Sequence, residues 1–217
     1  MTIALFDLDN TLLAGDSDYM WGKFLVKNKM VDGLLFEKEN QRFYDEYAAG
    51  VLDINAYLTF QLGVLAQYDK EELDEMRFKF LTENIEPIIT TKSRQLLKKH
   101  RENGDTLVII TATNRFVTTP IAQALDVEHL IATNVEIKNG QYTGKSFGTP
   151  CFQEGKVTLL NEWLQINQLD LAGSWFYSDS HNDLPLLNVV DNPVAVDPDP
   201  KLKKYAQQKG WPIISLR

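Results

Sequence analysis

Short apolar runs that suit buried strands recur along this 217-residue chain, and most are separated by amphipathic segments. The runs are IALFDL at 3–8, TLVIIT at 106–111, HLIATNVEI at 129–137, SWFYS at 174–178 and PVAVD at 193–197. The first run lacks strict alternation of apolar and polar residues, which is typical of a strand buried on both faces of a parallel sheet. Strands that alternate with helices on this scale predict a right-handed, doubly wound α/β sheet.

One block, residues 16–86, interrupts this alternation. Its apolar residues recur at helical spacing, as Leu73, Met76 and Phe80 do, and predict about four helices and no strand. We therefore expect a Rossmann-like doubly wound parallel sheet formed by residues 1–15 and 87–217, with an all-helical domain at 16–86 inserted after the first strand. The Asn139-Gly140 pair predicts a hairpin turn within the sheet domain.

Composition limits the partners and the compartment. The chain has 30 acidic and 22 basic residues and a net charge of −8, which disfavours nucleic acid as a partner. Its one cysteine, Cys151, cannot form an internal disulfide. The chain contains no apolar run of about 18 residues and no leader pattern, so we expect a cytoplasmic protein without a membrane partner. Whether it is a monomer or a dimer stays open.

Polar side chains follow three of the predicted strands at the point where each ends. Asp7 and Asp9 follow the first strand, Thr111 follows TLVII, and Asp179 and Asp183 follow SWFYS. Ligands of open α/β sheets bind at the carboxyl ends of the strands, so these groups are expected to converge. Converging carboxylates repel one another unless a cation lies among them, and oxygen ligands of this kind favour Mg²⁺.

A phosphate group suits such a metal because Mg²⁺ keeps coordination positions free for phosphate oxygens. The chain is acidic overall, so a dianionic ligand also needs a fixed positive charge nearby. Lys156, at the start of the predicted helix GKVTLL, is the candidate for that charge. The residues therefore predict a phosphate site built from aspartates, a metal ion and one lysine.

These residues resemble the four motifs of the haloacid dehalogenase (HAD) superfamily. DLDNT at 7–11 resembles its first motif, D-x-D-x-T, and LVIIT at 107–111 resembles the second. Lys156 matches the third motif, and SDSHND at 178–183 resembles the fourth. Together the motifs cover nearly the whole chain apart from most of the helical block.

The resemblance implies a role for each matched residue. Asp7 would be the nucleophile that becomes an aspartyl-phosphate, and Asp9 the general acid and base whose backbone carbonyl also binds Mg²⁺. Thr111 and Lys156 would hold the phosphoryl oxygens. The implied metal ligands are Asp7, Asp9 and Asp179, with Asn182 and Asp183 in supporting positions.

The resemblance also narrows the reaction. Family members that cleave carbon–halogen or carbon–phosphorus bonds lack an acid two residues after the nucleophile, so Asp9 favours hydrolysis of phosphate esters. A helical insertion between the first two motifs resembles the type-1 cap of subfamily IB, the phosphoserine-phosphatase-like branch. Such a cap covers the site and favours small molecules. We therefore expect a Mg²⁺-dependent phosphatase that hydrolyses a small-molecule phosphomonoester through an aspartyl-phosphate.

The sequence indicates the type of reaction more clearly than it indicates the substrate. Asp16 stands nine residues after Asp7, where phosphoserine phosphatases have an acid that reads the substrate ammonium; the alternative is that Asp16 only caps the following helix. Arg42 is a candidate for binding a substrate carboxylate. However, TAT at 111–113 replaces the S-G-G of true phosphoserine phosphatases. An amine-bearing ester is expected, either phosphoserine-like or one without a carboxylate, such as histidinol phosphate.

Two further alternatives remain at this stage. A phosphotransferase of the same fold would pass the phosphoryl group to an acceptor other than water. A receiver-type signalling module, phosphorylated on aspartate, shares an acidic Mg²⁺ pocket on a doubly wound sheet. His181 lies within the fourth motif, but we expect it to face solvent or to support the site rather than to take part in catalysis.

Overall fold

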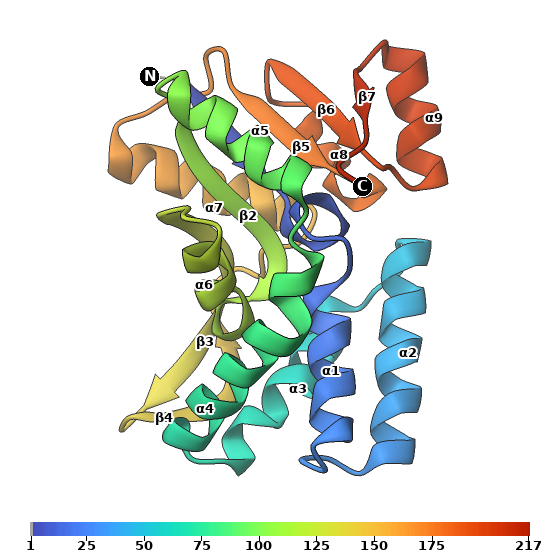
Figure 1. Cartoon of the computed structure of the whole chain (residues 1–217), viewed down its shortest axis with the longest axis vertical. Coiled ribbons are helices and arrows are strands. Elements are labelled where there is room, and N and C mark those ends of the chain that lie inside the picture. The colour runs from blue at the N-terminus through green and yellow to red at the C-terminus, as the bar shows by residue number, and fades with distance from the viewer. Residues whose placement is uncertain (1) are drawn as a thin grey trace.

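The computed structural model describes residues 2–217 and contains one seven-stranded sheet (Figure 1). Its strand order is β4-β3-β2-β1-β5-β6-β7. All neighbouring strands pair in parallel except β3 and β4, which form an antiparallel hairpin. The strands are β1 Ile3–Phe6, β2 Thr106–Asn114, β3 His129–Lys138, β4 Gln141–Phe147, β5 Trp175–Ser178, β6 Asn192–Val196 and β7 Ile213–Ile214. The predicted α/β doubly wound fold is confirmed.

Helices cover both faces of this sheet. Helices α5 and α6 lie on the face toward the viewer in Figure 1, and α7 and α8 lie behind it. The helices of the sheet domain are α5 Thr91–Glu102, α6 Arg115–Ala124, α7 Glu154–Asn167, α8 Leu184–Leu187 and α9 Pro200–Lys209. From β1, the strands β2 to β4 are added in sequence order on one side, and β5 to β7 are added in sequence order on the other side. The switch point of strand order therefore lies between β1 and β5.

Strand β1 shows why its sequence is apolar without alternation. Ile3 and Leu5 belong to one buried cluster, with α7, α8 and α9, whereas Ala4 and Phe6 belong to a second cluster on the opposite face. All four are fully buried. Because successive side chains of a strand point to opposite faces, a strand covered on both sides must be apolar at every position.

Four helices occupy the interrupting block, as predicted: α1 Ser17–Lys27, α2 Gly33–Ala49, α3 Ile54–Gly63 and α4 Lys70–Phe80. We call residues 16–86 the helical insert. The chain enters and leaves it through two adjacent segments, because Leu13 and Ile89 form an antiparallel bridge and the Ala14 N–H donates to the Ile88 carbonyl at 2.8 Å. The buried cluster that holds Phe6 continues into the insert through Trp21.

The hairpin predicted at Asn139-Gly140 is also present, and it packs against the helical insert. Gly144 of β4 has φ +77°, and a Cβ there would lie 3.1 Å from Ala66 Cβ and 3.3 Å from the Leu62 carbonyl oxygen. Only glycine combines that backbone conformation with so close an approach. The hairpin therefore contacts the insert as well as extending the sheet (Figure 1).

Strand β2 differs from the prediction. It was expected to end at Thr111 but runs to Asn114, with an irregularity in its pairing to β3 between Thr111 and Asn114. Such an irregularity changes the direction in which the side chains after Thr111 point.

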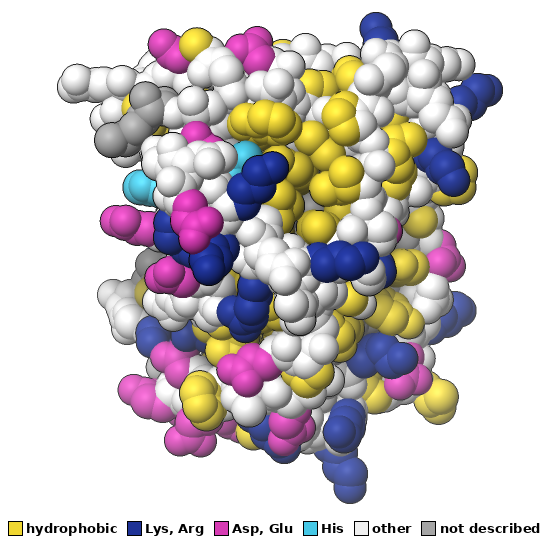
Figure 2. Space-filling view, turned by 45° about the horizontal axis from the view of Figure 1, so that its top comes forward, with side chains coloured by type: hydrophobic (Ala, Val, Ile, Leu, Met, Phe, Trp, Pro, Cys, Tyr) yellow, Lys and Arg dark blue, Asp and Glu magenta, His cyan; other side chains and the backbone are white. Residues whose placement is uncertain are grey.

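On the face shown in Figure 2, hydrophobic side chains gather toward the top, while Lys and Arg are interspersed with Asp and Glu lower down. None of the helices within residues 2–217 combines the length and the apolar character that a membrane crossing requires.

Candidate active site

The turn after β1 places Asp7 at the centre of the sheet edge. The Asp7 N–H donates to the Tyr177 carbonyl at 2.9 Å, so the residue is held between β1 and β5. The following turn, Leu8–Leu12, closes through the Leu13 N–H and the Leu8 carbonyl at 3.0 Å, with Asn10 in the left-handed region at φ +53°. This turn directs both Asp7 and Thr11 inward, where they are buried.

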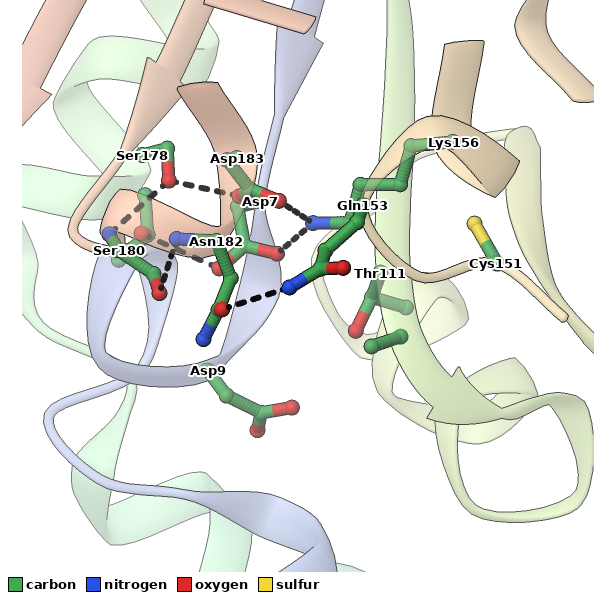
Figure 3. A network of polar contacts seen from close by, with 12 residues as sticks. Asp7, Asp9, Thr111, Cys151, Gln153, Lys156, Ser178, Ser180, Asn182 and Asp183 are labelled. Atoms are coloured by element: carbon green, nitrogen blue, oxygen red, sulfur yellow. Dashed lines mark hydrogen bonds and ion pairs between the residues drawn. The ribbon is translucent and has the colours of Figure 1, made fainter. Parts of the chain in front are cut away.

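Lys156 joins two of the predicted acids (Figure 3). Its Nζ lies 2.8 Å from Asp7 Oδ1 and 2.7 Å from Asp183 Oδ1, and all three side chains are buried. Burial by itself would lower the pKa of Lys156, but the charges of Asp183 and Asp7 outweigh it and hold that pKa above its ordinary value. The lysine is therefore a fixed cation at the nucleophile predicted from the sequence.

Asp183 is held from its other side by Ser178, whose Oγ donates to Asp183 Oδ2 at 2.7 Å. This bond orients the carboxylate so that its second oxygen meets the lysine. The arrangement matches the supporting role expected for Asp183 in positioning Lys156.

Asp179 lies beside Asp7 without such a cation. Thr11 Oγ1 is 3.1 Å from Asp179 Oδ1 and 3.3 Å from Asp7 Oδ2, and it also accepts a bond from the Asp179 N–H at 3.0 Å. Burial first, and then the charges of Asp7 and Asp183, raise the pKa of Asp179 well above its ordinary value. An acid with raised pKa next to a second acid is the donor set that a divalent cation would stabilise in its ionised form.

Within residues 2–217, no group of three or more His, Cys, Asp or Glu side chains is arranged to enclose a metal ion. This agrees with the contacts of the acids: Lys156 and Ser178 engage both oxygens of Asp183, whereas Lys156 contacts only Oδ1 of Asp7, and Asp179 pairs with no Lys or Arg of residues 2–217. Mg²⁺ binds through one or two carboxylates and keeps several waters, so two carboxylates and a backbone carbonyl suit it better than a closed cage would. The residues present therefore fit Mg²⁺.

Asp9 is held apart from that cluster by two hydrogen bonds. Its Oδ1 accepts from the Ser17 N–H at 2.6 Å, and its Oδ2 accepts from Thr113 Oγ1 at 2.8 Å. Burial and the charge of Asp16 raise the pKa of Asp9 to about 7, although the bonds from Ser17 and Thr113 oppose this shift. A carboxyl group with a pKa near 7 is suited to give and take protons at neutral pH.

Thr111 and Thr113 reach the site from β2. Thr111 is buried and lines the pocket together with Asp7 and Asp9, while its Oγ1 accepts from the Thr113 N–H at 3.2 Å. The predicted phosphate-binding residue therefore lies beside the predicted nucleophile. The extension of β2 to Asn114 explains the contact of Thr113 with Asp9.

Asn182 connects this site to the helical insert. Its Nδ2 donates to the Tyr47 carbonyl of α2 at 2.9 Å, and its Oδ1 accepts from Gln153 Nε2 at 3.2 Å. His181, by contrast, turns away toward α9, where its Nδ1 lies 2.7 Å from Asp199 Oδ2. Its Nε2 lies 3.2 Å from Lys201 Nζ, so both ring nitrogens contact residues at the start of α9.

The pocket itself lies between the sheet edge and the helical insert. Four acids line it, Asp7, Asp9, Asp16 and Asp18, together with aromatic residues of the insert, Tyr19, Phe43, Tyr44, Tyr47 and Tyr57. Lys156 contacts the lining residue Asp7, but no Lys or Arg among residues 2–217 forms an ion pair with Asp9, Asp16 or Asp18. A pocket with this lining is suited to a ligand whose part remote from the phosphate is cationic and flat.

The two residues considered for substrate recognition occupy different places. Asp16 lines the pocket and also caps α1, because its Oδ1 accepts from the Tyr19 N–H at 2.8 Å; both alternatives considered for it are compatible with its position. Arg42 lies on the outside of α2, where it pairs with Glu39 at 2.7 Å and Glu46 at 2.6 Å. In this structure Arg42 does not line the pocket.

Asp18 is a pocket acid that the sequence analysis did not single out. It is 4% exposed and accepts from Tyr57 Oη at 2.5 Å. The signal that points to it is helical spacing: Asp18 shares one buried face of α1 with Trp21, Gly22 and Leu25. An acid on the apolar face of an amphipathic helix is an exception that calls for a partner or a ligand.

Known proteins are similar to this chain over most or all of its length. A family model described as haloacid dehalogenase-like hydrolase matches residues 4–188. A histidinol-phosphatase of Neisseria meningitidis serogroup C (strain 8013) is 44% identical, and the alignment covers 99% of each chain. A crystal structure of a protein of unknown function from Bordetella pertussis Tohama I is 42% identical, with a TM-score of 0.94 and full coverage of both chains.

A substrate-bound phosphoserine phosphatase is similar in fold, with a TM-score of 0.73, 17% identity and coverage of 100% of this chain and 93% of that one. These results leave no ground for the receiver-type alternative, since the family model describes hydrolases and a relative of 44% identity is a phosphatase. The chain belongs to the haloacid dehalogenase-like hydrolase family, among its phosphatases.

Proposed function

We propose that this phosphatase hydrolyses histidinol phosphate, with Mg²⁺ and through a phosphorylated Asp7. The observation that carries the choice of substrate is the pocket lining: two acids beyond the catalytic pair, Asp16 and Asp18, and no Lys or Arg among the described residues. Histidinol phosphate carries an ammonium group and an imidazole ring and has no carboxylate. The 44% identical relative is named for this activity.

The same lining disfavours phosphoserine. Its carboxylate would enter a pocket in which Asp16 and Asp18 carry the charge, and like charges in a desolvated site repel strongly. Arg42, the residue considered for binding such a carboxylate, is paired with two glutamates on the outer surface of α2.

In the first step, a carboxylate oxygen of Asp7 attacks phosphorus and the bond between phosphorus and the ester oxygen breaks. Asp9 in its acid form donates a proton to that oxygen, so that histidinol leaves as an alcohol. The Nζ of Lys156, 2.8 Å from Asp7 Oδ1, and the hydroxyl of Thr111 compensate the charge on the phosphoryl oxygens.

In the second step, Asp9 in its base form removes a proton from water, which attacks the phosphorus of the phosphorylated Asp7. The bond between phosphorus and the Asp7 oxygen breaks, inorganic phosphate leaves, and Asp9 is again protonated. Asp7, Asp179 and the backbone carbonyl of Asp9 would hold the Mg²⁺, which would supply positive charge to the phosphoryl oxygens.

A phosphate-release assay with the wild-type protein tests the substrate. We expect kcat/KM for histidinol phosphate to exceed that for phosphoserine by at least about 100-fold, since phosphoserine lacks the imidazole and adds a carboxylate, and to exceed that for phosphoethanolamine by at least about tenfold, since phosphoethanolamine lacks only the imidazole. Equal rates on the three esters would contradict the proposal.

Two companion measurements address the metal and the intermediate. Removing divalent cations with a chelator is expected to abolish turnover, and Mg²⁺ is expected to restore it. Rapid quenching with labelled substrate is expected to trap label on Asp7 for seconds or less. Product analysis with added alcohols separates hydrolysis from phosphoryl transfer, which is the remaining alternative.

A further inference from the structure

Asp18 has a place in the pocket that neither the catalytic steps nor the contacts of Asp16 account for. It lies on α1, whereas its hydrogen-bond partners come from α3 and from the end of β2: Tyr57 Oη at 2.5 Å and Asn114 Nδ2 at 3.4 Å. The side chain is 4% exposed and nevertheless lines the pocket. Residues of two different elements, α3 and β2, therefore orient the Asp18 carboxylate in the pocket.

The direction of these hydrogen bonds is determined by a wider network. Asn114 caps α6 by accepting from the Val117 N–H at 3.2 Å, which leaves its amide nitrogen for Asp18. Gln61 Nε2 lies 3.3 Å from Tyr57 Oη and donates to it, so the tyrosine hydrogen points to Asp18. Both neighbours are donors, and the Asp18 carboxylate acts purely as an acceptor.

Acceptor capacity remains after these bonds. A carboxylate offers about four lone-pair positions, and Tyr57 and Asn114 use one on each oxygen. No Lys or Arg among residues 2–217 lines this pocket, so the charge of Asp18 has no protein cation there to balance it. Without a ligand such a buried acid is neutralised by taking up a proton, and a ligand that brings an N–H donor or a positive charge can replace that proton.

Aromatic rings surround the same space. Tyr57 packs against Phe43 with ring centres 5.3 Å apart, and Tyr19 packs against Tyr44 with ring centres 4.9 Å apart. Tyr44 is 36% exposed, which places it at the pocket rim. Rings of this kind favour a flat or cationic ligand group over an aliphatic one.

We propose that Asp18, oriented by Tyr57, is the specificity residue that accepts a hydrogen bond from the imidazole N–H of the substrate, while Asp16 binds the ammonium group. This inference rests on the proposed function and adds to it a residue that selects a nitrogen heterocycle. Tyr57 is a positioning residue in this scheme, since it acts through Asp18.

The test compares two substrates that differ at one ring. Phenylalaninol phosphate keeps the ammonium group and the phosphate of histidinol phosphate but carries a phenyl ring without an N–H. We expect Asp18→Asn to reduce the ratio of kcat/KM for histidinol phosphate to that for phenylalaninol phosphate at least about tenfold, mainly through KM, because a charge-assisted hydrogen bond is lost. Tyr57→Phe should reduce the ratio less.

Two control variants accompany this comparison. Asp16→Asn should lower kcat/KM for both substrates and change the ratio less than about threefold. Asp45→Asn, an exposed acid on the outside of α2, should leave the ratio as in the wild type.

The outcomes separate the two proposals. A wild-type protein that does not hydrolyse histidinol phosphate overturns both. A wild type that does so, with an unchanged ratio in Asp18→Asn, overturns only the role of Asp18. If Asp18→Asn does not fold, competition in the wild type decides: histidinol should inhibit at least about tenfold more strongly than phenylalaninol, and equal inhibition would refute the assignment.

Discussion

The core side and the insert side of this pocket both carry buried or half-buried acids, but the protein compensates the charge of these acids differently on the two sides. On the core side, Asp7 and Asp183 share Lys156 at 2.8 and 2.7 Å. On the insert side, Asp16 and Asp18 receive hydrogen bonds from a backbone N–H, a tyrosine and an asparagine, with no Lys or Arg among the described pocket residues.

This difference matches a division of tasks in which the core side carries out catalysis and the insert side binds the rest of the substrate. A phosphoryl group brings negative charge, so the catalytic side must hold positive charge before the substrate arrives. A ligand that brings positive charge needs the opposite arrangement, in which protein acids are held in place without a protein cation. Substitutions on the two sides should therefore have different consequences.

Removing the nucleophile should have the largest effect. Asp7→Asn keeps the shape of the side chain but removes the attacking carboxylate, so we expect kcat to fall by at least about 10³-fold. Phosphate release measures the loss, and circular dichroism checks that the variant is folded. The exposed Asp45→Asn serves as the control, and substantial activity in a folded Asp7→Asn would refute the assigned chemistry.

Removing the core cation should cost stability as well as activity. Lys156→Met leaves Asp7 and Asp183 buried without their shared cation, and breaking a buried ion pair in this way costs about 3–5 kcal/mol. Lys98→Met is the matched control, since its pair with Glu102 is exposed and is worth about 0–1 kcal/mol. Urea unfolding measures both. Equal losses would show that the buried charges are compensated elsewhere.

On the insert side, the buried acid Asp18 should make the free energy of unfolding depend on pH. Burial raises the pKa of Asp18 from its ordinary 3.8 to about 7. The folded protein therefore holds this proton more tightly than the unfolded chain does, and the associated stability, fully present below about pH 4, is lost as the pH rises through 7.

We expect Asp18→Asn, without substrate, to gain about 2–4 kcal/mol relative to the wild type between pH 4 and pH 8, since each pKa unit corresponds to about 1.4 kcal/mol. Urea unfolding at several pH values provides the measurement. Parallel pH profiles for variant and wild type would contradict the uncompensated burial of this acid.

The smallest effect is expected outside the pocket. Arg42→Ala should change kcat/KM by less than about twofold, because its guanidinium pairs with Glu39 and Glu46 on the surface of α2. Steady-state kinetics on the preferred ester check this. A large rise in KM would show that Arg42 takes part in substrate binding, and would contradict the absence of a protein cation on the insert side of the pocket.

Much of the fold and of the catalytic side followed from local patterns. The strand runs, the glycine-containing hairpin turn and the helical block were all predicted, because periodicity and turn chemistry act over a few residues. Asp7, Asp9 and Thr111 were predicted because polar residues at strand ends meet at one edge of a parallel sheet, and Lys156 because a dianionic ligand of an acidic chain needs a fixed positive charge. The extension of β2 to Asn114 was missed, since the irregular pairing with β3 depends on a partner strand.

Recognition was harder to predict than catalysis. Arg42 was considered as a cation that could bind a substrate carboxylate. Asp18 was not considered, and an acid in the first turn of a helix does not stand out in a sequence because such acids are common there. Only the packing of α1 against α3 and β2 buries Asp18 and brings Tyr57 and Asn114 to it.

The order of amino acids specifies which groups are available: a D-x-D pair after a buried strand, a lysine at a helix start and a second acidic loop. Which of the acids have a protein cation beside them depends on the folded structure. Lys156 reaches Asp7 across 149 positions of the chain, whereas no lysine or arginine of the described chain lines the pocket beside Asp18. Charge compensation in a buried site depends on distance in space, and that distance is defined only once the chain has folded.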